Sequence, residues 1–238
     1  LPIIKSWGLD YCDLRAKIFG KGCEYLTSEE LVEVKKLLKE NGLKLGCLQT
    51  SLAKVQLPDR ERQALEEAKM EGIIRAADAL DCNLARCFFY WHPKDELRGK
   101  LSILPDQQQR VLDMFEPLAN RAIKAGLKIG FENCGVTADE VFTILDELNV
   151  PGWGLAWDPS NGWEQKENLE DEVEYLVTCA QRSVMVHVKA RGSVIPLEDE
   201  ILPWSRILTT CAAAGLEGPV SAETHNRDKA KSDADVSH

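Results

Sequence analysis

Four short apolar runs of this chain end in side chains of the kind that bind metal ions. The runs are 128–131, 154–157, 184–186 and 219–222, and the residues that follow them are Glu132, Asp158, His187 and Glu223. An ionised carboxylate does not end a buried apolar strand unless a partner compensates its charge. One shared cation would satisfy the carboxylates and the imidazole together. Three oxygen donors and one nitrogen donor suit a divalent ion such as Mn²⁺, Mg²⁺, Co²⁺ or Zn²⁺.

Each of the four residues has a simpler explanation when it is considered alone. Glu132 or Glu223 would be a charge at the rim of the fold or a helix cap. Asp158 precedes Pro159 and would begin a turn, and His187 would be a hydrogen-bonded core histidine. Four such residues at matching positions of successive runs favour a common site over separate coincidences.

A site of this kind can move protons on a carbon next to a carbonyl group. The hydrogen on a carbon next to a carbonyl is weakly acidic, and a divalent metal that holds the carbonyl and a neighbouring hydroxyl stabilises the enediolate. A carboxylate within hydrogen-bond reach takes the proton, which is typically a ~10²–10⁴-fold effect. Return of the proton to the other face gives epimerisation, return to the neighbouring carbon gives isomerisation, and loss of a β-hydroxyl gives dehydration. The ligands alone do not choose among these reactions.

The elements that must position these residues alternate between strand and helix. Most of the predicted strands are near-continuous apolar runs, which is typical of strands covered on both faces of a parallel sheet. They are Tyr11–Arg15, Lys44–Gln49, Leu84–Phe89, Lys128–Glu132, Gly154–Asp158, Val184–Val188 and Val220–Glu223. Helices are predicted between them from capping boxes, prolines and glycine stops. They are 28–40, 58–80, 105–125, 137–148, 168–180 and 203–214.

This alternation predicts a single α/β domain over residues 1–238, a (β/α)8 TIM barrel whose strand ends all face one mouth. Seven strands are visible in the sequence, whereas a closed barrel of this type has eight. Leu1–Trp7 is too close to Tyr11 to be a strand followed by a helix, and we interpret it as the tail of a first helix. We therefore expect the first βα unit and part of the last helix to be missing from this sequence.

The composition narrows the range of partners. The chain has 39 acidic and 29 basic residues, a formal net charge of −10, and no Lys/Arg-rich run, so nucleic acid is a poor partner. No apolar run of about 18 residues is present, so neither a transmembrane helix nor a membrane partner is expected. The eight cysteines form no C-x-x-C pair, and we expect reduced thiols and a cytoplasmic location.

The segments GLKIGFEN, GLAWDPSN, VMVHVK and GPVSAETH resemble strands of the xylose isomerase-like barrel superfamily, and the resemblance covers nearly the whole chain. That superfamily includes sugar phosphate isomerases, ketose 3-epimerases, hydroxypyruvate isomerases, inosose dehydratases and endonuclease IV. The resemblance implies that Glu132, Asp158, His187 and Glu223 bind a divalent metal. It also implies that Glu132 and Glu223 are the catalytic acid/base pair on opposite faces of the substrate.

Two positions depart from the superfamily pattern and leave the reaction and substrate open. Asn161 stands where epimerases often have a histidine, and Ala190 stands where many relatives have an aspartate. We predict substrate contacts near the strand ends from Asn161, Lys189, Arg191, His92 and Trp157. The simpler explanations are a surface position for Lys189, an exposed loop for His92 and core packing for Trp157.

The residues and the resemblance together favour a divalent-metal-dependent isomerase or epimerase that acts on a sugar or sugar phosphate. An inosose-type dehydratase would use the same site on a polyol ketone. A nuclease like endonuclease IV needs many histidines, whereas this chain has four and is acidic. A barrel that only binds a sugar would not need the pair of glutamates. Relatives commonly pair, so a homo-oligomer is a further expectation.

Overall fold

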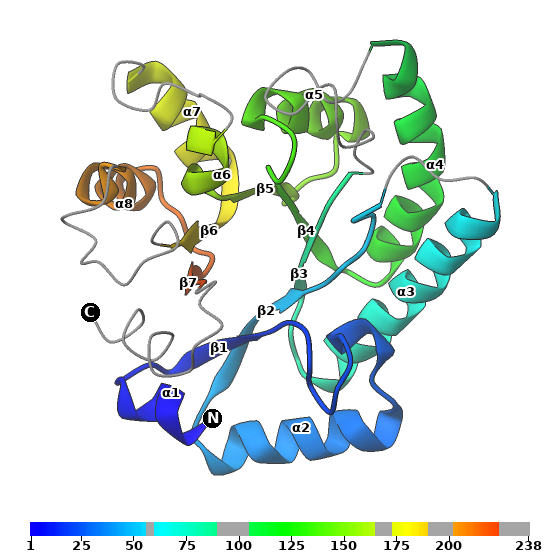
Figure 1. Ribbon diagram of the computed structural model, residues 1–238, viewed down its shortest axis with the longest axis vertical. Coiled ribbons are helices and arrows are strands. Elements are labelled where there is room, and N and C mark those ends of the chain that lie inside the picture. Colours follow the sequence, from blue (N-terminus) through cyan, green and yellow to red (C-terminus); the bar gives the residue numbers. More distant parts are fainter. Residues whose placement is uncertain (56–59, 90–104, 165–172, 190–201, 224–238) are drawn as a thin grey trace.

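The computed structural model describes residues 1–55, 60–89, 105–164, 173–189 and 202–223, in which strands and helices alternate (Figure 1). The strands are β1 (Tyr11–Leu14), β2 (Lys44–Gln49), β3 (Leu84–Cys87), β4 (Lys128–Glu132), β5 (Gly154–Trp157), β6 (Ser183–Val188) and β7 (Val220–Ala222). The helices are α1 (Pro2–Ser6), α2 (Ser28–Glu40), α3 (Arg60–Ala79), α4 (Pro105–Lys124), α5 (Ala138–Leu148), α6 (Pro159–Glu164), α7 (Val173–Arg182) and α8 (Trp204–Ala213). A short 3₁₀ helix, η1 (Cys23–Tyr25), follows β1.

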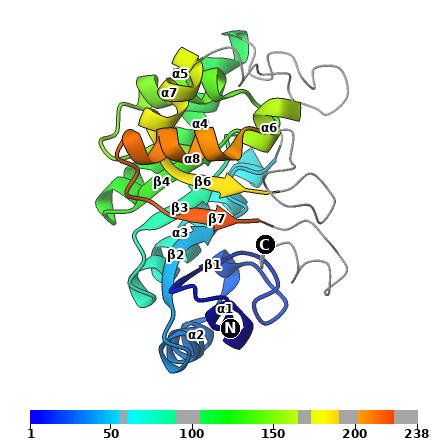
Figure 2. The same cartoon turned by 90° about the vertical axis from the view of Figure 1, so that its left-hand side faces the viewer.

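The seven strands form one sheet in sequence order, and every neighbouring pair is parallel. The sheet curls into a nearly closed barrel with the helices around its outside (Figures 1 and 2). Within the described residues, β1 and β7 are the two unpaired edges. Side chains nevertheless bridge these edges, because the Ser221 hydroxyl donates to Asp13 Oδ2 at 2.5 Å.

The structure confirms the predicted α/β barrel, and each predicted strand agrees with the observed one to within two residues. Leu1–Trp7, which was expected to be helical, contains α1. The sequence did not predict α6, where only a turn was considered. There the Asp158 carboxylate accepts the backbone N–H of Asn161 at 3.0 Å, and Pro159 takes the first helical position.

Two helix starts depend on reciprocal contacts between a threonine and a glutamate. The Thr27 and Thr137 side chains accept the backbone N–H groups of Glu30 and Glu140, both at 3.3 Å. The two glutamates in turn accept the threonine backbone N–H groups at 2.7 and 2.8 Å. These contacts satisfy N–H groups that have no partner within the helix, so they fix where α2 and α5 begin.

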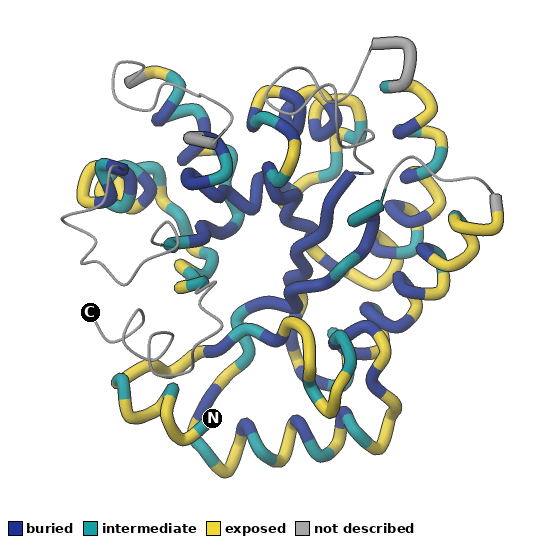
Figure 3. Tube along the Cα trace, in the orientation of Figure 1, coloured by how far each residue is buried: buried dark blue, intermediate teal, exposed yellow. Residues whose placement is uncertain are grey.

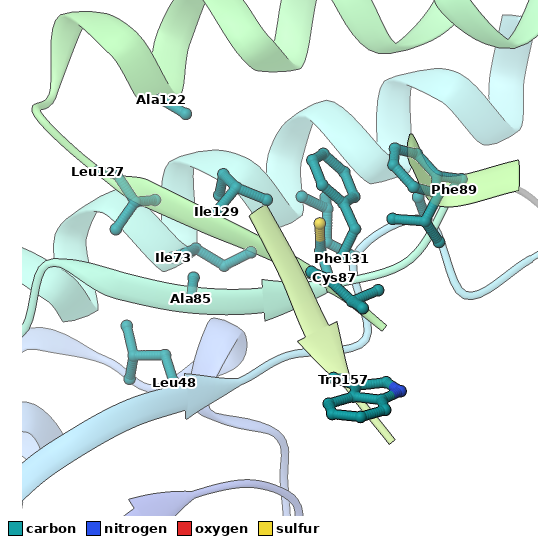
Figure 4. Close-up of a cluster of buried hydrophobic side chains, with 14 of the residues drawn as sticks. Leu48, Ile73, Ala85, Cys87, Phe89, Ala122, Leu127, Ile129, Phe131 and Trp157 are labelled. Atoms are coloured by element: carbon teal, nitrogen blue, oxygen red, sulfur yellow. The ribbon is translucent and has the colours of Figure 1, made fainter. Parts of the chain in front are cut away.

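The main hydrophobic core lies between the sheet and the outer helices, and Figure 4 shows part of it. Phe131 of β4 stacks on Phe89 with ring centroids 3.8 Å apart. It also meets Phe115 of α4 at 5.2 Å in an edge-on arrangement. Aromatic rings bury large apolar areas, so this cluster is a major source of stability and holds β4 firmly against α4.

A second, smaller core lies inside the barrel, on the opposite face of the strands, and includes Cys47, Leu84, Ala156 and Met185. Gly130 belongs to this inner face, because a Cβ there would lie 3.0 Å from Val184 and 3.2 Å from Ala156. Side chains alternate along a strand, so residues two positions further on also point inward. These residues are Gln49, Arg86, Glu132, Asp158 and His187.

No helix among the described residues is long and apolar enough to cross a membrane. All eight cysteines are free thiols, and seven of them are buried.

Candidate metal centre

Glu132, Asp158 and His187 meet inside the barrel at the carboxyl ends of β4, β5 and β6. Each offers one oxygen or nitrogen atom, and these three atoms lie within 4.8 Å of one another. All three residues are buried, with at most 5% of their surface exposed. Adjacent parallel strands deliver them to the same level of the barrel, as expected when strand ends share one mouth. The structure thus brings together three of the four residues predicted to bind a metal.

Asp158 is held in place through its backbone and one carboxylate oxygen. The Asn133 side chain accepts the Asp158 N–H at 2.8 Å and donates to the Asp158 carbonyl at 3.0 Å. Asp158 Oδ1 accepts the N–H of Asn161, whereas Oδ2 forms an ion pair with Lys189, whose Nζ lies 2.6 Å away. Burial raises the pKa of Asp158 against the opposing effect of Lys189. One oxygen of this buried carboxylate therefore already faces a positive charge, that of the Lys189 ammonium.

Glu132 lies between a buried arginine and a half-buried amide. Its Oε2 lies 3.1 Å from Arg86 Nε, and its Oε1 accepts a hydrogen bond from Asn161 Nδ2 at 3.1 Å. Burial alone would raise the pKa of Glu132, but the neighbouring positive charges, Arg86 first among them, together outweigh burial and the pKa is lowered. Glu132 is therefore an ionised carboxylate in a nearly dry environment.

Lys189 brings a positive charge to the other side of the group. Its Nζ lies 2.6 Å from Asp158 Oδ2 and donates to Asn161 Oδ1 at 3.0 Å. Burial alone would lower the pKa of Lys189, but the neighbouring Asp158 outweighs it and the pKa is raised. Asn161 and Lys189, both predicted to contact the substrate, therefore lie directly beside the buried carboxylates.

Glu223 lies just beyond β7 and is not part of the close group of three. Its carboxylate forms an ion pair with Arg15, and its Oε2 lies 3.9 Å from Lys189 Nζ. Its side chain is 13% exposed, more than those of Glu132 and Asp158. Glu223 thus faces the group across the Lys189 ammonium.

The donor set fits a divalent cation. His187 Nδ1 is buried, has no hydrogen bond among the described residues and lies 3.9 Å from Glu132 Oε2. Buried polar atoms normally have a partner, so this ring nitrogen beside two buried carboxylates fits the position of a metal ligand. Two carboxylates and an imidazole are ligands that Mg²⁺, Mn²⁺ and Zn²⁺ accept in proteins.

Sequence reasoning missed Gln49, Arg86 and Asp13, which line the barrel interior beside His187. Arg86 is only 2% exposed, and its Nε donates to Gln49 Oε1 at 2.7 Å. Gln49 Nε2 donates to Asp13 Oδ2 at 2.9 Å. The sequence did indicate Arg86, because this charged residue interrupts the apolar run LARCFF. It lies two residues after Leu84, so both side chains point to the same face of the strand. A buried charge at such a position needs a partner inside the barrel.

The other three residues that were predicted to contact the substrate are Trp157, His92 and Arg191. Trp157 is fully buried in the main core, so the core-packing alternative is the one that the structure shows (Figure 4). Its position alternates with the inward-facing Ala156 and Asp158, which explains why it points toward the helices instead. His92 and Arg191 lie outside the described residues.

Residues 1–237 match the family model described as xylose isomerase-like TIM barrel. No curated protein matches the chain. Among solved structures, a xylose isomerase-like TIM barrel protein from Mycobacterium smegmatis in complex with magnesium has a TM-score of 0.76 at 15% identity, covering 99% of this chain and 84% of that one. A D-allulose 3-epimerase from Methylomonas sp. in complex with D-allulose has a TM-score of 0.71 at 15% identity, covering 94% and 76%. An AP endonuclease, family 2, from Brucella melitensis has a TM-score of 0.72 at 12% identity, covering 97% and 88%. At these identities the neighbours establish the fold, and they include proteins with different reactions.

Proposed function

Because this chain belongs to the xylose isomerase-like TIM barrel family, we propose that it is a divalent-metal-dependent isomerase or epimerase of a sugar or related polyol ketone. The observation that carries the proposal is the buried group of Glu132, Asp158 and His187, in which His187 Nδ1 has no hydrogen bond within the described chain. These three residues would hold the ion, and Glu223 is the proposed fourth ligand. A divalent ion bound there would act as a Lewis acid toward oxygen atoms of the substrate.

The proton transfer itself would belong to the two glutamates. Glu132 is kept ionised by Arg86, so it is ready to accept a proton from the carbon next to a carbonyl. Glu223 stands across Lys189 from the buried group and would act from the other face of the substrate. Transfer to that face inverts the carbon, and transfer to the neighbouring carbon moves the carbonyl.

Asn161 and Lys189 would orient the substrate and balance charge. The Asn161 amide is shared between Glu132 and Lys189, and both contacts are within 3.1 Å. A sugar hydroxyl can replace either contact without loss of a hydrogen bond, since it both donates and accepts. The Lys189 ammonium would stabilise negative charge that develops on a substrate oxygen.

The structural neighbour with bound D-allulose makes ketoses the first substrates to test. Protein stripped of metal with EDTA would be reloaded separately with Mn²⁺, Mg²⁺, Co²⁺ or Zn²⁺ and incubated in D₂O with D-allulose, other ketoses and their phosphates. We expect turnover with at least one metal, with deuterium on a substrate carbon and no loss of water. The Glu132→Gln variant is the matched control, because it keeps the side-chain shape and removes the base.

Other results would replace the proposal with a named alternative. An enone-type absorbance with loss of water would mean a dehydratase acting on a polyol ketone. Nicking of a duplex with an abasic site would mean a nuclease, the activity suggested by the name of one structural neighbour. Full turnover by the stripped protein would rule out the metal requirement.

A further inference from the structure

We propose that Gln49 is a positioning residue that sets which nitrogen of His187 carries the ring hydrogen, and that it thereby weakens metal binding at this centre. The inference rests on the proposed function for its metal, but the arrangement of hydrogen bonds that it describes does not. Gln49 ends β2 and is 7% exposed, and its amide lies 3.0 Å from His187 Nε2.

The orientation of the Gln49 amide is determined by two charged neighbours. Arg86 is always a donor, so the atom of Gln49 that lies 2.7 Å from Arg86 Nε must be the amide oxygen. Asp13 is an acceptor when ionised, so the atom that lies 2.9 Å from Asp13 Oδ2 must be the amide nitrogen. Rotating the amide by half a turn would place donor against donor at Arg86 and acceptor against acceptor at Asp13.

Both of these neighbours are themselves held in place. Arg86 also contacts Glu132 Oε2 at 3.1 Å and donates from Nη1 to the Thr50 carbonyl at 2.8 Å. Asp13 Oδ2 also accepts the Ser221 hydroxyl. The Gln49 amide therefore has little freedom to choose another orientation, which is the condition under which a polar network specifies one arrangement.

The fixed amide decides the arrangement of the neutral His187 ring. One Gln49 N–H group goes to Asp13, and the other points at His187 Nε2, which must then accept. The ring hydrogen is left on Nδ1, the nitrogen that lies 3.9 Å from Glu132 Oε2. In this arrangement Nδ1 carries the ring hydrogen and does not offer a lone pair to a metal.

Metal binding through Nδ1 would require the ring hydrogen to lie on Nε2, opposite the Gln49 N–H. Histidine ligands in proteins almost always donate their second N–H to an acceptor, which strengthens metal binding by about 10–100-fold. Here the second nitrogen of His187 meets a donor instead. The centre is thus built to bind its metal weakly, and Gln49 is the residue responsible.

Nitrogen NMR of metal-stripped protein with isotope-labelled histidines tests the hydrogen position directly, without any variant. At a pH where the rings are neutral, the two tautomers give different patterns of couplings to the ring carbons. The His187→Asn variant assigns the signal among the four histidines. We expect the hydrogen on Nδ1 of His187. A hydrogen on Nε2 would overturn the proposal, whether or not the protein binds metal or turns over a sugar.

Titration with Mn²⁺ alone, followed by the electron paramagnetic resonance signal of the free ion, tests the consequence. Gln49→Glu places an acceptor opposite Nε2, and we expect Mn²⁺ affinity to rise about 10–100-fold. Gln49→Met removes the donor without adding charge, and we expect affinity above that of the parent. Affinity equal to or below that of the parent in both folded variants would show that Gln49 does not weaken metal binding, contrary to the proposal. If no protein binds Mn²⁺ but the NMR result holds, the proposed function fails and the positioning role of Gln49 stands.

Discussion

The central strands and the edge strands of the barrel differ in burial. β3 and β5 are buried at every residue, whereas Tyr11 of β1 and Val220 of β7 are 55% and 53% exposed (Figure 3). The central strands are paired on both sides, whereas β1 and β7 each have one paired neighbour in the described chain. A strand with a paired neighbour on each side and packing on both faces is constrained more than an edge strand. Side chains at the ends of the central strands therefore have less freedom to move.

The candidate centre is divided between these two regions. Glu132 ends β4 and Asp158 comes directly after β5, and both of these strands are paired on each side. The two residues lie close to His187. Glu223 follows from an edge strand, and its direction is set by an ion pair with Arg15, which is 45% exposed. We infer that metal affinity depends mainly on the central residues, and that Glu223, the proposed fourth ligand, contributes less to affinity than to proton transfer.

The largest expected effect tests this division of roles between Glu132 and Glu223. Glu132→Gln and Glu223→Gln should each lower turnover by about 10²–10⁴-fold, since each removes one member of the proposed acid/base pair. Only Glu132→Gln should also lower Mn²⁺ affinity by more than about tenfold, as expected for the loss of a ligand. Steady-state kinetics and Mn²⁺ titration of both variants provide the measurement. Equal losses of affinity would mean that Glu223 is a full ligand and that the two regions act alike.

A second prediction compares the same two regions in stability. Phe131→Ala removes the ring that stacks on Phe89 in the closed core, and should lower the free energy of unfolding by about 3–5 kcal/mol. Val220→Ala on the exposed edge is the matched control and should change it by no more than about 0.5 kcal/mol. Urea denaturation followed by circular dichroism measures both. A comparable loss for Val220→Ala would show that the edge is packed as tightly as the centre.

A third prediction concerns the buried ion pair of Arg86 and Glu132. Arg86→Met leaves the Glu132 carboxylate without its nearest positive charge and should cost about 3 kcal/mol of unfolding free energy. The double variant Arg86→Met/Glu132→Met removes both charges and should regain much of this loss, because the desolvation cost of the carboxylate disappears. Thermal and urea unfolding would measure the free energy of unfolding of the single and the double variant. No recovery in the double variant would mean that Arg86 acts through Gln49 and Thr50 more than through Glu132.

The same contrast explains what the sequence could and could not predict. The seven strands and the convergence of Glu132, Asp158 and His187 follow from apolar runs, which mark both a buried strand and the point where it ends. Trp157 was misplaced because a strand end alone does not say which face a side chain takes. That face depends on alternation from a known interior residue such as Ala156.

The surroundings of Glu223 and Gln49 could not be predicted from the sequence of their own strands. The position of Glu223 depends on Arg15, more than two hundred residues earlier in the chain, and no local pattern records such a pairing. Gln49 gains its role from Arg86 and Asp13 on the strands on either side of β2. Local patterns therefore predicted the elements and the convergence of the central residues, whereas cross-strand contacts between charged side chains required the structure.

The smallest expected effect is that of Arg15→Met at the open edge. An ion pair with one half-exposed partner contributes about 0–1 kcal/mol, so the unfolding free energy should change by no more than that. Removal of the guanidinium frees the Glu223 carboxylate and takes a positive charge from the mouth, so Mn²⁺ affinity should rise by about a few-fold, because opposite charges attract more strongly when a competing cation is lost. Lys17→Met, an exposed residue of the same loop, is the charge-matched control. An affinity gain shared by both variants would reflect net charge alone, whereas a gain confined to Arg15→Met would show that the edge ion pair holds Glu223 away from the central group.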